Sequence, residues 1–390
     1  MTAHTKERAL ERIQALSGCG LDVQSFFDEA TEALSAAVPN NGGTGINPFW
    51  YTLDPASMLI TSMVGICDMP IEDVIQFEYV DDDFNKAVDV GRNPQGIQTL
   101  KEATGGDPSR SRTYREYMQP LGIEQEALVA LRTRRGDNWG TVRLVRARSQ
   151  EEFSEDDLDF LRVLSPHLAE GARRGLLTGE ATEPEGPDAP GLVVLAEDYS
   201  VLWMTPAGEE LLEELGGEVV GGGPLPTAVL SVAAQAMAIA GGDEPPDGVA
   251  MARVRSQRGR WFALHGAALA TTGRWQAPVI IEPDRPARIA PLLMALFGLT
   301  PREQEITRYV LQGDSTARIA ADLHLSPHTV QQHLKGIFEK TGVRSRRGLV
   351  AKVFATHYDP RVRDNDHRQH NDKLIRGGPF PHRKSNGDRT

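Results

Sequence analysis

The sequence predicts a multidomain protein in which two α+β domains precede a small all-α domain. A length of 390 residues suggests two or three domains at about 150 residues each. The apolar patterns are interrupted by a Pro-, Gly- and Glu-rich segment at 178–190 and by a run of prolines at 283–291. Strand-like alternation gives way to helical spacing from about residue 292.

These breaks set the expected boundaries. A tail rich in Asn, Asp, His and Arg, with few aliphatic residues, is expected to be disordered. The segments are a first domain at 10–177, a linker at 178–190, a second domain at 191–284, a third at 292–358 and the tail at 359–390.

Composition excludes several classes of protein. With 40% hydrophobic and 25% charged residues, disorder of the whole chain is excluded. No stretch approaches the roughly 18 apolar residues of a membrane helix, and the N-terminus carries charge where a signal peptide is apolar. Cys19 and Cys67 do not make a disulfide framework. The expected protein is cytoplasmic, with no membrane partner.

The first domain reads as helix, antiparallel sheet, helix. Strand-like runs flank Asp54 and Pro55, and a second pair flanks the turn at 135–137, so two hairpins are expected. Ser154 and Asp157 have the spacing of a capping box. The leucines that follow share one side of a helix, which is expected to pack on the sheet. The expected strands are 49–53, 58–64, 127–134 and 139–148.

The second domain begins with two short strands and a helix. Residues 192–195 and 201–204 flank a turn, and Thr205 and Pro206 then form an N-cap and a first helical position. Glu209 and Glu210 lie near the positive end of this helix. A meander of three strands, 251–255, 261–269 and 279–281, is expected to complete the domain.

The third domain carries the most specific helix signals. Thr300, Pro301 and Glu303 combine an N-cap, a first-position proline and a capping-box glutamate, and Gly313 stands where a left-handed C-cap belongs. A short helix at 315–323 follows, and Ser326 with Pro327 starts another. Two helices joined this tightly must cross steeply, which predicts a helix-turn-helix. Leucine, valine and phenylalanine at 349–354 predict a fourth helix.

The helix beginning at Pro327 has two different faces. At about 100° per residue, Val330, Leu334 and Ile337 fall on one side. The opposite side holds amide, imidazole and ammonium groups without a carboxylate, and the first acid is Glu339. Glutamine can bond adenine, and lysine can meet guanine or phosphate. His333 borders the apolar face, where a structural role is expected. The polar residues are His328, Gln331, Gln332 and Lys335.

Charge is unevenly distributed along the chain. The formal net charge is −12, yet 298–358 holds nine Lys and Arg against five Asp and Glu. The tail holds eight against five, which leaves −19 for residues 1–297. Three arginines within 343–347 suit phosphate contacts. This asymmetry suggests a polyanion for the basic end, although a charge of +4 over sixty residues is also an ordinary surface.

Residues 299–354 resemble the four-helix DNA-binding domain of LuxR-type transcriptional regulators. The resemblance is carried by Leu299 to Glu303, Ile319-Ala320, Ser326 with Thr329-Val330, His333-Leu334, and Gly342 to Arg346. It implies that the helix at 327–341 lies in the major groove of double-stranded DNA and that the fourth helix pairs two subunits. Gln331 replaces the lysine usual in that family, which removes one phosphate or guanine contact.

The face, the caps and the resemblance together give one set of expected DNA-binding residues. They are Ser326, His328, Thr329, Gln331, Gln332, Lys335, Arg344 and Arg346.

The two front domains resemble sensor folds. Residues 10–177 are similar to a GAF-type domain, mainly through the helix after the second hairpin, and 191–284 to a PAS-type domain. Both resemblances imply a small-molecule effector or homodimer formation. Phe49, Trp50 and Tyr51 are candidates for a pocket, although aromatic residues of strands usually belong to a core.

No catalytic or metal site is expected and no cofactor is implied, while the residues that would bind a ligand or cofactor stay unknown from the sequence. Phosphate-loop, nucleophile-elbow, HExxH and paired CxxC motifs are absent from the sequence. Haem ligation or oxidation sensing is an alternative for Cys67, but it has no evident partner and is expected to be a plain buried thiol. His367 and His370 have the HxxH spacing of a metal site but lie in the tail that is expected to be disordered. The sequence also lacks the acidic pattern of a phosphorylatable receiver domain.

The leading hypothesis is therefore a sequence-specific transcriptional regulator that functions as a homodimer. RNA polymerase is a further expected partner. A sigma-like polymerase subunit is a second, but the acidic front offers no promoter-melting domain. An enzymatic front domain localised by the C-terminus is a third. A partner-binding module with weakened DNA binding is a fourth, given Gln331 and the negative total charge.

Overall fold

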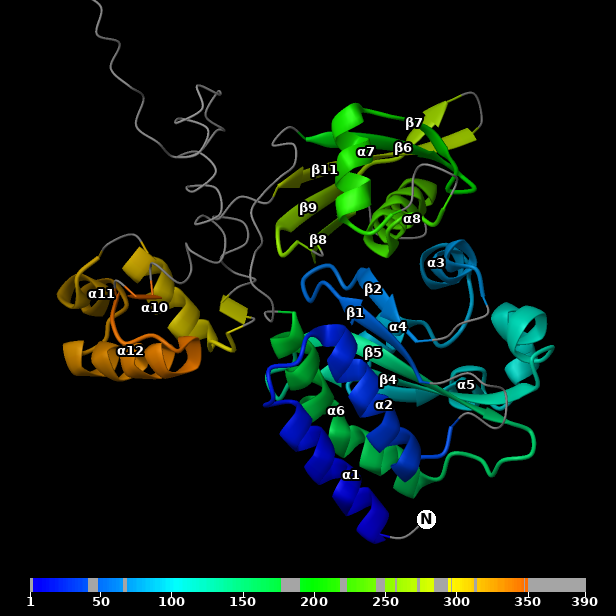
Figure 1. The fold of residues 1–390 in the computed structure, drawn as a ribbon, viewed down its shortest axis with the longest axis horizontal. Coiled ribbons are helices and arrows are strands. Elements are labelled where there is room, and N and C mark those ends of the chain that lie inside the picture. Colours follow the sequence, from blue (N-terminus) through cyan, green and yellow to red (C-terminus); the bar gives the residue numbers. More distant parts are fainter. Residues whose placement is uncertain are drawn as a thin grey trace, which may run out of the picture.

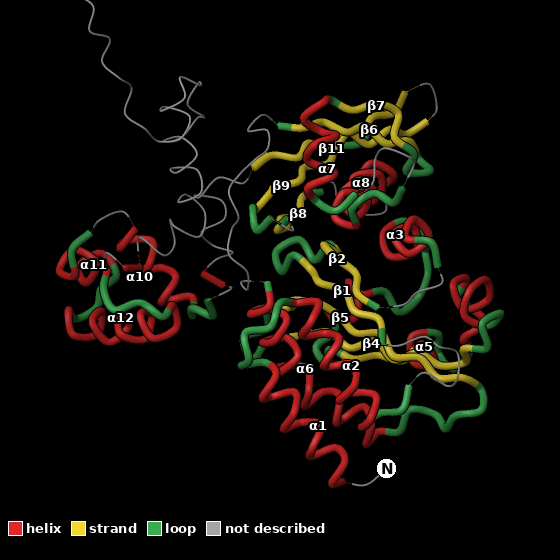
Figure 2. Tube along the Cα trace, viewed as in Figure 1, coloured by secondary structure: helices red, strands yellow, loops and turns green. Residues whose placement is uncertain are grey.

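The computed structural model shows two sheet regions and a C-terminal helical lobe (Figures 1 and 2). In the part that it describes, no helix is long and apolar enough to cross a membrane. The expected tail, Cys67, Gly313, Arg347, most of the expected linker and most of the expected fourth helix lie outside the described residues. The described residues are 3–40, 48–65, 69–176, 190–217, 223–242, 250–256, 258–271, 274–283, 294–295, 297–311, 314–346 and 348–349.

The N-terminal sheet region, residues 3–176, is built on an antiparallel sheet with strand order β2-β1-β5-β4-β3. Both expected hairpins are confirmed as β1–β2 and β4–β5. Because side chains alternate along a strand, Trp50 faces the helices and stacks on Phe27 at 4.7 Å, whereas Phe49 and Tyr51 pack on the other face. The strands are β1 Phe49–Leu53, β2 Ile60–Val64, β3 Ile97–Thr99, β4 Ile123–Arg132 and β5 Asn138–Ala147.

Three long helices cover one face of this sheet (Figure 1). They are α1 Ala3–Leu16, α2 Val23–Ala37 and α6 Glu155–Gly175. The expected capping box at the start of α6 is present, since Ser154 Oγ accepts from Asp157 N at 3.2 Å and the Asp157 carboxylate accepts from Ser154 N. The four spaced leucines of α6 are buried against the sheet, as expected.

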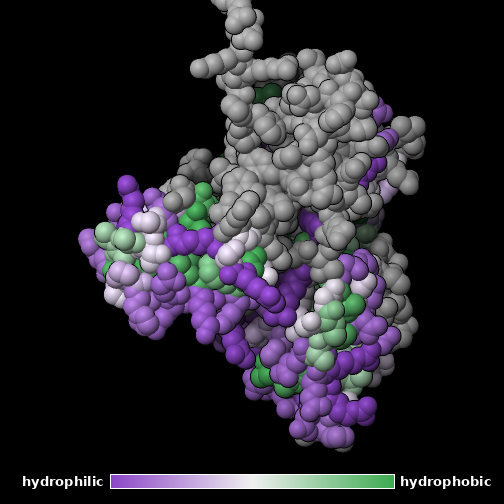
Figure 3. Space-filling view, turned by 60° about the vertical axis from the view of Figure 1, so that its left-hand side comes forward, coloured by the Kyte–Doolittle hydropathy of each residue, from purple (hydrophilic) through white to green (hydrophobic). Residues whose placement is uncertain are grey.

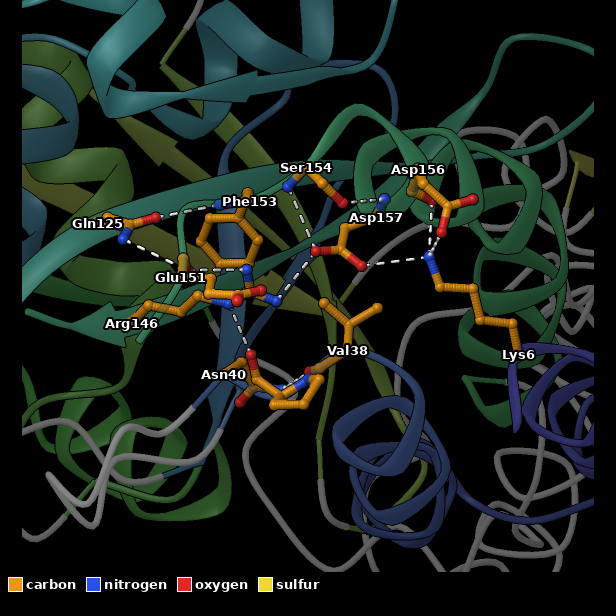
Figure 4. A network of polar contacts seen from close by, with 11 residues as sticks. Lys6, Val38, Asn40, Gln125, Arg146, Glu151, Phe153, Ser154, Asp156 and Asp157 are labelled. Atoms are coloured by element: carbon orange, nitrogen blue, oxygen red, sulfur yellow. Dashed lines mark hydrogen bonds and ion pairs between the residues drawn. The ribbon is translucent and has the colours of Figure 1, made fainter. Parts of the chain in front are cut away.

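A polar network fixes α6 to its neighbours (Figure 4). Lys6 Nζ donates to Asp156 Oδ2 at 2.7 Å and to Asp157 Oδ1 at 3.2 Å. Arg146 donates to the Pro39 carbonyl at 2.7 Å and to Asp157 Oδ2 at 3.1 Å. These bonds join the beginning of α1, the end of α2, strand β5 and the beginning of α6.

The opposite face carries short elements that the sequence analysis did not assign. Their ends are fixed locally, as where Thr99 and Glu102 form a capping box. Such short helices have too few turns for a clear period. They are α3 Ile71–Tyr79, α4 Ala87–Arg92, α5 Leu100–Ala103, a 3₁₀ turn at Pro108–Arg110 and a π-helical turn at Tyr114–Met118.

The second sheet region, residues 190–283, has strand order β7-β6-β11-β9-β8, and β10 also pairs with β11. The expected N-cap is confirmed, because Thr205 Oγ1 accepts from Gly208 N at 3.1 Å with Pro206 at the first helical position. The elements are β6 Gly191–Ala196, β7 Val201–Met204, α7 Pro206–Glu214, α8 Thr227–Gly241, β8 Met251–Arg255, β9 Trp261–Gly266, β10 Leu269–Thr271 and β11 Arg274–Pro283.

Helix α8 was not predicted from the sequence. It contacts β9 and β11 of its own sheet on one side and α3 and β2 of the N-terminal region on the other. Because it is buried around most of its circumference, its sequence lacks the polar face that would reveal an amphipathic helix.

The two sheet regions share a packed interface. Leu59 and Ile75 of the N-terminal region belong to the apolar core of the second region. Asp54 accepts three hydrogen bonds from Arg253, at 2.8 Å from its backbone N, 3.1 Å from Nε and 3.0 Å from Nη2. Tyr199 donates to Gln76 Oε1 at 3.1 Å. The two regions therefore meet through apolar and ionic contacts.

The C-terminal helical lobe contains α10 Pro301–Leu311, α11 Thr316–Asp322 and α12 Pro327–Thr341 around its own apolar core. In the segment leading into it, Ala295 and Phe297 pack against the cluster that Trp139 of the N-terminal region forms with Trp261 of the second region. Arg135 also donates to the Gly298 carbonyl. The lobe is thus attached at a point where the sheet regions meet.

Candidate nucleic-acid interface

Helix α12 begins at the expected cap. Ser326 Oγ accepts from Thr329 N at 3.0 Å and shares a hydrogen bond with the Thr329 hydroxyl at 2.8 Å, and Pro327 occupies the first helical position. Both hydroxyls lie at the N-terminus of the helix, where the helix dipole favours an anion.

A tight turn sets the angle between α11 and α12. His324 takes a left-handed φ of 53°, and Leu325 N donates to the Ala320 carbonyl at 2.8 Å. Arg302 of α10 donates to the Leu323 carbonyl in the same turn at 2.7 Å. The predicted helix-turn-helix arrangement of α11 and α12 is confirmed.

The buried face of α12 is the one predicted. Val330, Leu334 and Ile337 are all buried in the lobe core together with Ile306 and Ile319. His333 is half-buried, consistent with its place beside the apolar face. Anchoring these residues fixes the rotation of the helix, so the opposite side chains are directed to solvent.

The outward face consists of His328, Gln331, Gln332 and Lys335, all exposed. Gln332 Nε2 lies 3.1 Å from His328 Nε2, and Lys335 Nζ lies 4.0 Å from the exposed Glu339 carboxylate. Figure 3 turns this side of the molecule forward and shows mostly hydrophilic residues on the outer surface of the lobe. The amide and ammonium groups are thus accessible to a partner.

The two described arginines after α12 differ in their contacts. Arg344 is exposed, whereas Arg346 donates to the Asp314 carbonyl at 2.6 Å and to Thr316 Oγ1 at 2.8 Å. Gln331 Nε2 donates to the same hydroxyl at 3.3 Å. Thr316, at the start of α11, therefore joins the predicted surface. The sequence analysis missed it, and its place directly after the Ser315 cap is the signal that points to it.

The Thr300-to-Glu303 segment does more than cap α10. The Glu303 carboxylate accepts from Thr300 N at 2.6 Å and also from Lys340 Nζ at 2.8 and 2.5 Å. Lys340 lies at the end of α12, so Glu303 joins the first helix of the lobe to the outward-facing one. Together with the bond from Arg302, it holds α12 in place.

Replacing Glu303 by Gln is expected to loosen α12. Hydrogen bonds to charged groups contribute about 1.5–3 kcal/mol, so amide hydrogen exchange in α10 and α12 should accelerate correspondingly, while α6 stays unchanged. The matched control is Glu305→Gln, which breaks the partly exposed ion pair between Glu305 and Arg302. It should cost under about 1 kcal/mol. Equal acceleration in both variants would contradict this role.

The effect should depend on pH. Burial acts to raise the pKa of Glu303, but the hydrogen bonds from Lys340 and Thr300 outweigh it and hold the pKa below its ordinary value. Its stabilisation is therefore complete above the pKa of an unfolded glutamate, about 4.3, and is lost as the pH falls through the lower folded value. The difference in amide hydrogen exchange between the wild type and Glu303→Gln, compared at each pH, should therefore shrink below about pH 4.

Basic side chains also gather where the lobe meets the N-terminal region. Arg134 and Arg135 of the β4–β5 turn, Arg173 and Arg174 of α6, and Lys340 line a cleft of about 580 Å³. The sequence analysis missed this group because its members lie far apart in the chain. The carboxylate of Glu170 pairs with both α6 arginines. The cleft therefore lies between the lobe and the N-terminal region, and its positive charge is partly neutralised.

The other candidates are core residues or lie outside the described ranges. Phe49, Trp50 and Tyr51 are buried core residues, as the alternative interpretation held, and Trp50 Nε1 donates to Thr31 Oγ1 at 2.9 Å. Phe49 and Tyr51 also line a small cavity of about 60 Å³, whereas Trp50 packs on the opposite face of the sheet. Cys67, His367 and His370 lie outside the described residues. Within the described ranges, no group of three or more His, Cys, Asp or Glu side chains is placed to hold a metal ion.

Comparison with known proteins agrees with this geometry. Residues 298–353 match the GerE family, described as bacterial regulatory proteins of the luxR family. Over 55 residues the chain is 34% identical to the spore germination protein GerE of Bacillus subtilis (strain 168). This matched stretch covers 14% of this chain and 74% of GerE. The chain belongs to the luxR family.

Other similarities of this luxR-family chain are more limited. It is 38% identical over 70 residues to the probable transcriptional regulatory protein NarL of Mycobacterium tuberculosis (strain ATCC 25618 / H37Rv), covering 18% of this chain and 30% of NarL. A bacteriophytochrome from the photosynthetic bacterium R. palustris, RpBphP3, is 11% identical with a TM-score of 0.28, covering 72% of this chain and 62% of that one. So low a TM-score assigns no fold to the front regions.

Proposed function

We propose that this protein regulates transcription by inserting α12 into the major groove of double-stranded DNA and reading bases there. The observation that carries the proposal is the face of α12 that displays Gln331, Gln332 and Lys335 to solvent while its aliphatic side is anchored in the lobe core. A helix fits the major groove, where amide groups can bond adenine and an ammonium can bond guanine.

Phosphate contacts complete the proposed interface. His328 and the Ser326 and Thr329 hydroxyls lie at the beginning of α12, where backbone N–H groups and the helix dipole favour a phosphate. Arg344 is exposed beyond the other end of α12, and Arg346 fixes the start of α11 while keeping its positive charge on this side. Such contacts position the protein on DNA, and the base contacts select the sequence.

The front regions are proposed to control this reader. In this proposal, residues 10–177 form a GAF-like domain and 191–284 a PAS-like domain, which sense a small effector or hold a homodimer together. The cluster of Trp139 and Trp261 supports this control, because it combines residues of both sheet regions and Phe297, just before α10, packs against it. A dimer would present two recognition helices to a two-fold symmetric operator, and RNA polymerase is the partner through which transcription would change.

The salt dependence of binding tests the role of Lys335. Each phosphate contact releases condensed counterions, so replacing Lys335 by Ala should lower the slope of log affinity against log salt by about one if the ammonium meets phosphate. A slope that is unchanged, with altered base preference, would assign Lys335 to guanine. Lys101→Ala is the matched control, because Lys101 is an exposed lysine of the N-terminal region paired with Glu152. The slope is measured by fluorescence anisotropy of a labelled duplex.

Two assays separate this function from its alternatives. Transcription from core polymerase plus this protein alone, on a promoter template, would indicate a sigma-like subunit. Absence of DNA binding by the full chain at low salt would indicate a partner-binding module. The proposed regulator instead binds specific duplexes and changes transcription only when a complete polymerase is present.

A further inference from the structure

The cleft between the lobe and the N-terminal region, about 580 Å³ in volume, has the size of a small-molecule site. Three elements that are distant in the sequence form most of it: the β4–β5 turn, the C-terminal half of α6 and the last turn of α12. Small-molecule sites commonly occur where domains meet. The described lining includes no residue of the outward face of α12, so the cleft is separate from the proposed base-reading surface.

The charges that line this cleft are mostly positive. Its described lining holds four arginines and Lys340, against the two acids Asp137 and Glu170. Lys340 is also paired with Glu303, which lies outside the lining. With that third acid included, five positive charges still exceed the negative ones by two. A cleft lined mainly by one sign of charge concentrates its electrostatic field and attracts ions of the opposite sign, here anions.

The two arginines of the β4–β5 turn are available to a ligand. Arg134 is exposed, and its side chain makes no hydrogen bond or ion pair with any described residue. Arg135 is exposed as well, and its guanidinium donates to the Gly298 carbonyl, a neutral acceptor. No carboxylate among the described residues is paired with either guanidinium. Because a guanidinium presents parallel N–H donors, each of the two can bond a pair of phosphate oxygens.

Arg173 adds a buried positive charge to the same cleft. Its side chain is 9% exposed, and its Nε donates to Glu170 Oε2 at 2.9 Å, which fixes the guanidinium in place. Pro166, Ala295 and Phe297 add apolar side chains to the lining. Charges interact more strongly beside apolar groups than in bulk water, so an anion in this cleft is stabilised more than on an open surface.

His167 of α6 lies in the same lining and responds to its charge. Burial and the positive charge of Arg134 both lower the pKa of the imidazole. A neighbouring cation disfavours the protonated imidazole, and a bound anion would favour it. His167 is therefore a reporter of the electrostatic potential in the cleft.

We propose that this cleft binds a small polyphosphate, a molecule with two or more linked phosphate groups, through Arg134 and Arg135 on one element and the cations of α6 and α12 on the others. Cations on three elements suit a ligand with several anionic groups, and each terminal phosphate carries about −1.5 to −2 charges at pH 7. A concave site of this volume fits a small molecule rather than a DNA duplex.

Binding would connect the two parts of the protein. The ligand contacts the N-terminal region through the β4–β5 turn and α6, and the lobe through Lys340 at the end of α12. It therefore stabilises the docked position of the lobe. The regulatory consequence, a change in DNA affinity, rests on the proposed function, whereas ligand binding itself does not. By linkage, DNA and the polyphosphate would change each other's affinity by the same factor.

Isothermal titration calorimetry on the full chain tests the site without DNA. The probe is inorganic tripolyphosphate, and orthophosphate and sulfate serve as single-anion controls at the same ionic strength. Tripolyphosphate is expected to bind with one site per chain and at least tenfold more tightly than either control. The proposal would be overturned if tripolyphosphate did not bind at about 1 mM. Equal affinity for sulfate would also overturn it, since the cleft would then hold an adventitious ion only.

Variants locate the bound probe. Arg134→Gln should weaken tripolyphosphate binding at least tenfold. Arg134→Lys should restore part of the affinity, because an ammonium keeps the charge but lacks the paired donors. Arg8→Gln is the matched control, since Arg8 is an exposed arginine of α1 with no ion pair among the described residues and lies outside the lining. It should bind like the wild type. Unchanged affinity in Arg134→Gln would refute the assignment.

The imidazole signals of His167 report binding at the cleft itself. They are assigned in the NMR spectrum by their absence from His167→Gln. Tripolyphosphate should raise the pKa of His167 in the wild type, because an anion favours the protonated imidazole. A pKa that stays unchanged at saturating tripolyphosphate would place the probe elsewhere and overturn the proposal. Hydrogen exchange of β4 and β5 reports whether the Arg134 variants are folded, and the wild-type titration of His167 decides the outcome if they are not.

A separate arm with duplex DNA distinguishes this proposal from the proposed function. Anisotropy of a labelled duplex is measured on the same preparations. If Arg134→Gln weakened duplex binding while tripolyphosphate did not bind the wild type, the cleft would belong to the DNA interface and the proposal would be wrong. If tripolyphosphate bound as expected and no duplex bound, the proposed function would fail and the polyphosphate site would stand.

Discussion

Replacing Gln331, Gln332 and Lys335 together by alanine is expected to reduce specific DNA affinity about 100-fold or more. Each good base contact contributes about 1–3 kcal/mol of discrimination, and neighbouring contacts need not add. All three side chains are exposed on α12 and contribute nothing to the lobe core. The fold should therefore be preserved, and binding measured by anisotropy at fixed salt should fall to the nonspecific level.

The matched control for that variant replaces an exposed glutamine and an exposed lysine of the N-terminal region by alanine. Gln24 is exposed on α2, and Lys101 is exposed on α5. Their double alanine variant should bind like the wild type. If the triple variant retained wild-type affinity and selectivity, α12 would not present the reading face.

Replacing Asp54 by Asn is expected to separate the two sheet regions and to cost about 3–5 kcal/mol, because it leaves a largely buried arginine without its counter-charge. The Asp54 side chain is 0% exposed and that of Arg253 is 11% exposed. Hydrogen exchange in β1, β2 and β8 should accelerate strongly, and thermal unfolding should move to lower temperature.

A second substitution distinguishes the charge from the shape of that pair. Adding Arg253→Met to Asp54→Asn removes the unpaired charge, so the double variant should recover much of the lost stability. Lys101→Ala, which breaks an exposed pair with Glu152, should cost under about 1 kcal/mol. A cost of Asp54→Asn as small as that of the surface pair would show that this contact does not hold the regions together.

The elements predicted correctly are those whose signals are local. Capping residues such as Ser154, Thr205 and Ser326 act within one turn, and the apolar stripe of α12 repeats within a short window. Because these signals do not depend on the rest of the chain, the sequence was sufficient to predict them. The outward face of α12 followed from the same periodicity.

What was missed depends on contacts between distant residues. Helix α8 lacks a polar face because two sheets cover it, and a uniformly apolar run does not distinguish a helix from a strand. The hydrogen bond from Lys340 to the Glu303 carboxylate joins positions 37 residues apart, and that from Arg302 to the Leu323 carbonyl joins positions 21 residues apart. The role of Thr316 likewise appears only once Arg346 lies beside it.

Selection of duplexes from a random library by the full chain, followed by sequencing, tests the base-reading role of α12 most directly. The wild type is expected to enrich a defined motif. Gln332→Ala should lose its preference at one base pair and keep the remainder, since a single amide contacts a single base edge. Enrichment of no motif by the wild type, or of an identical motif with identical strength by Gln332→Ala and by the triple variant, would contradict the account.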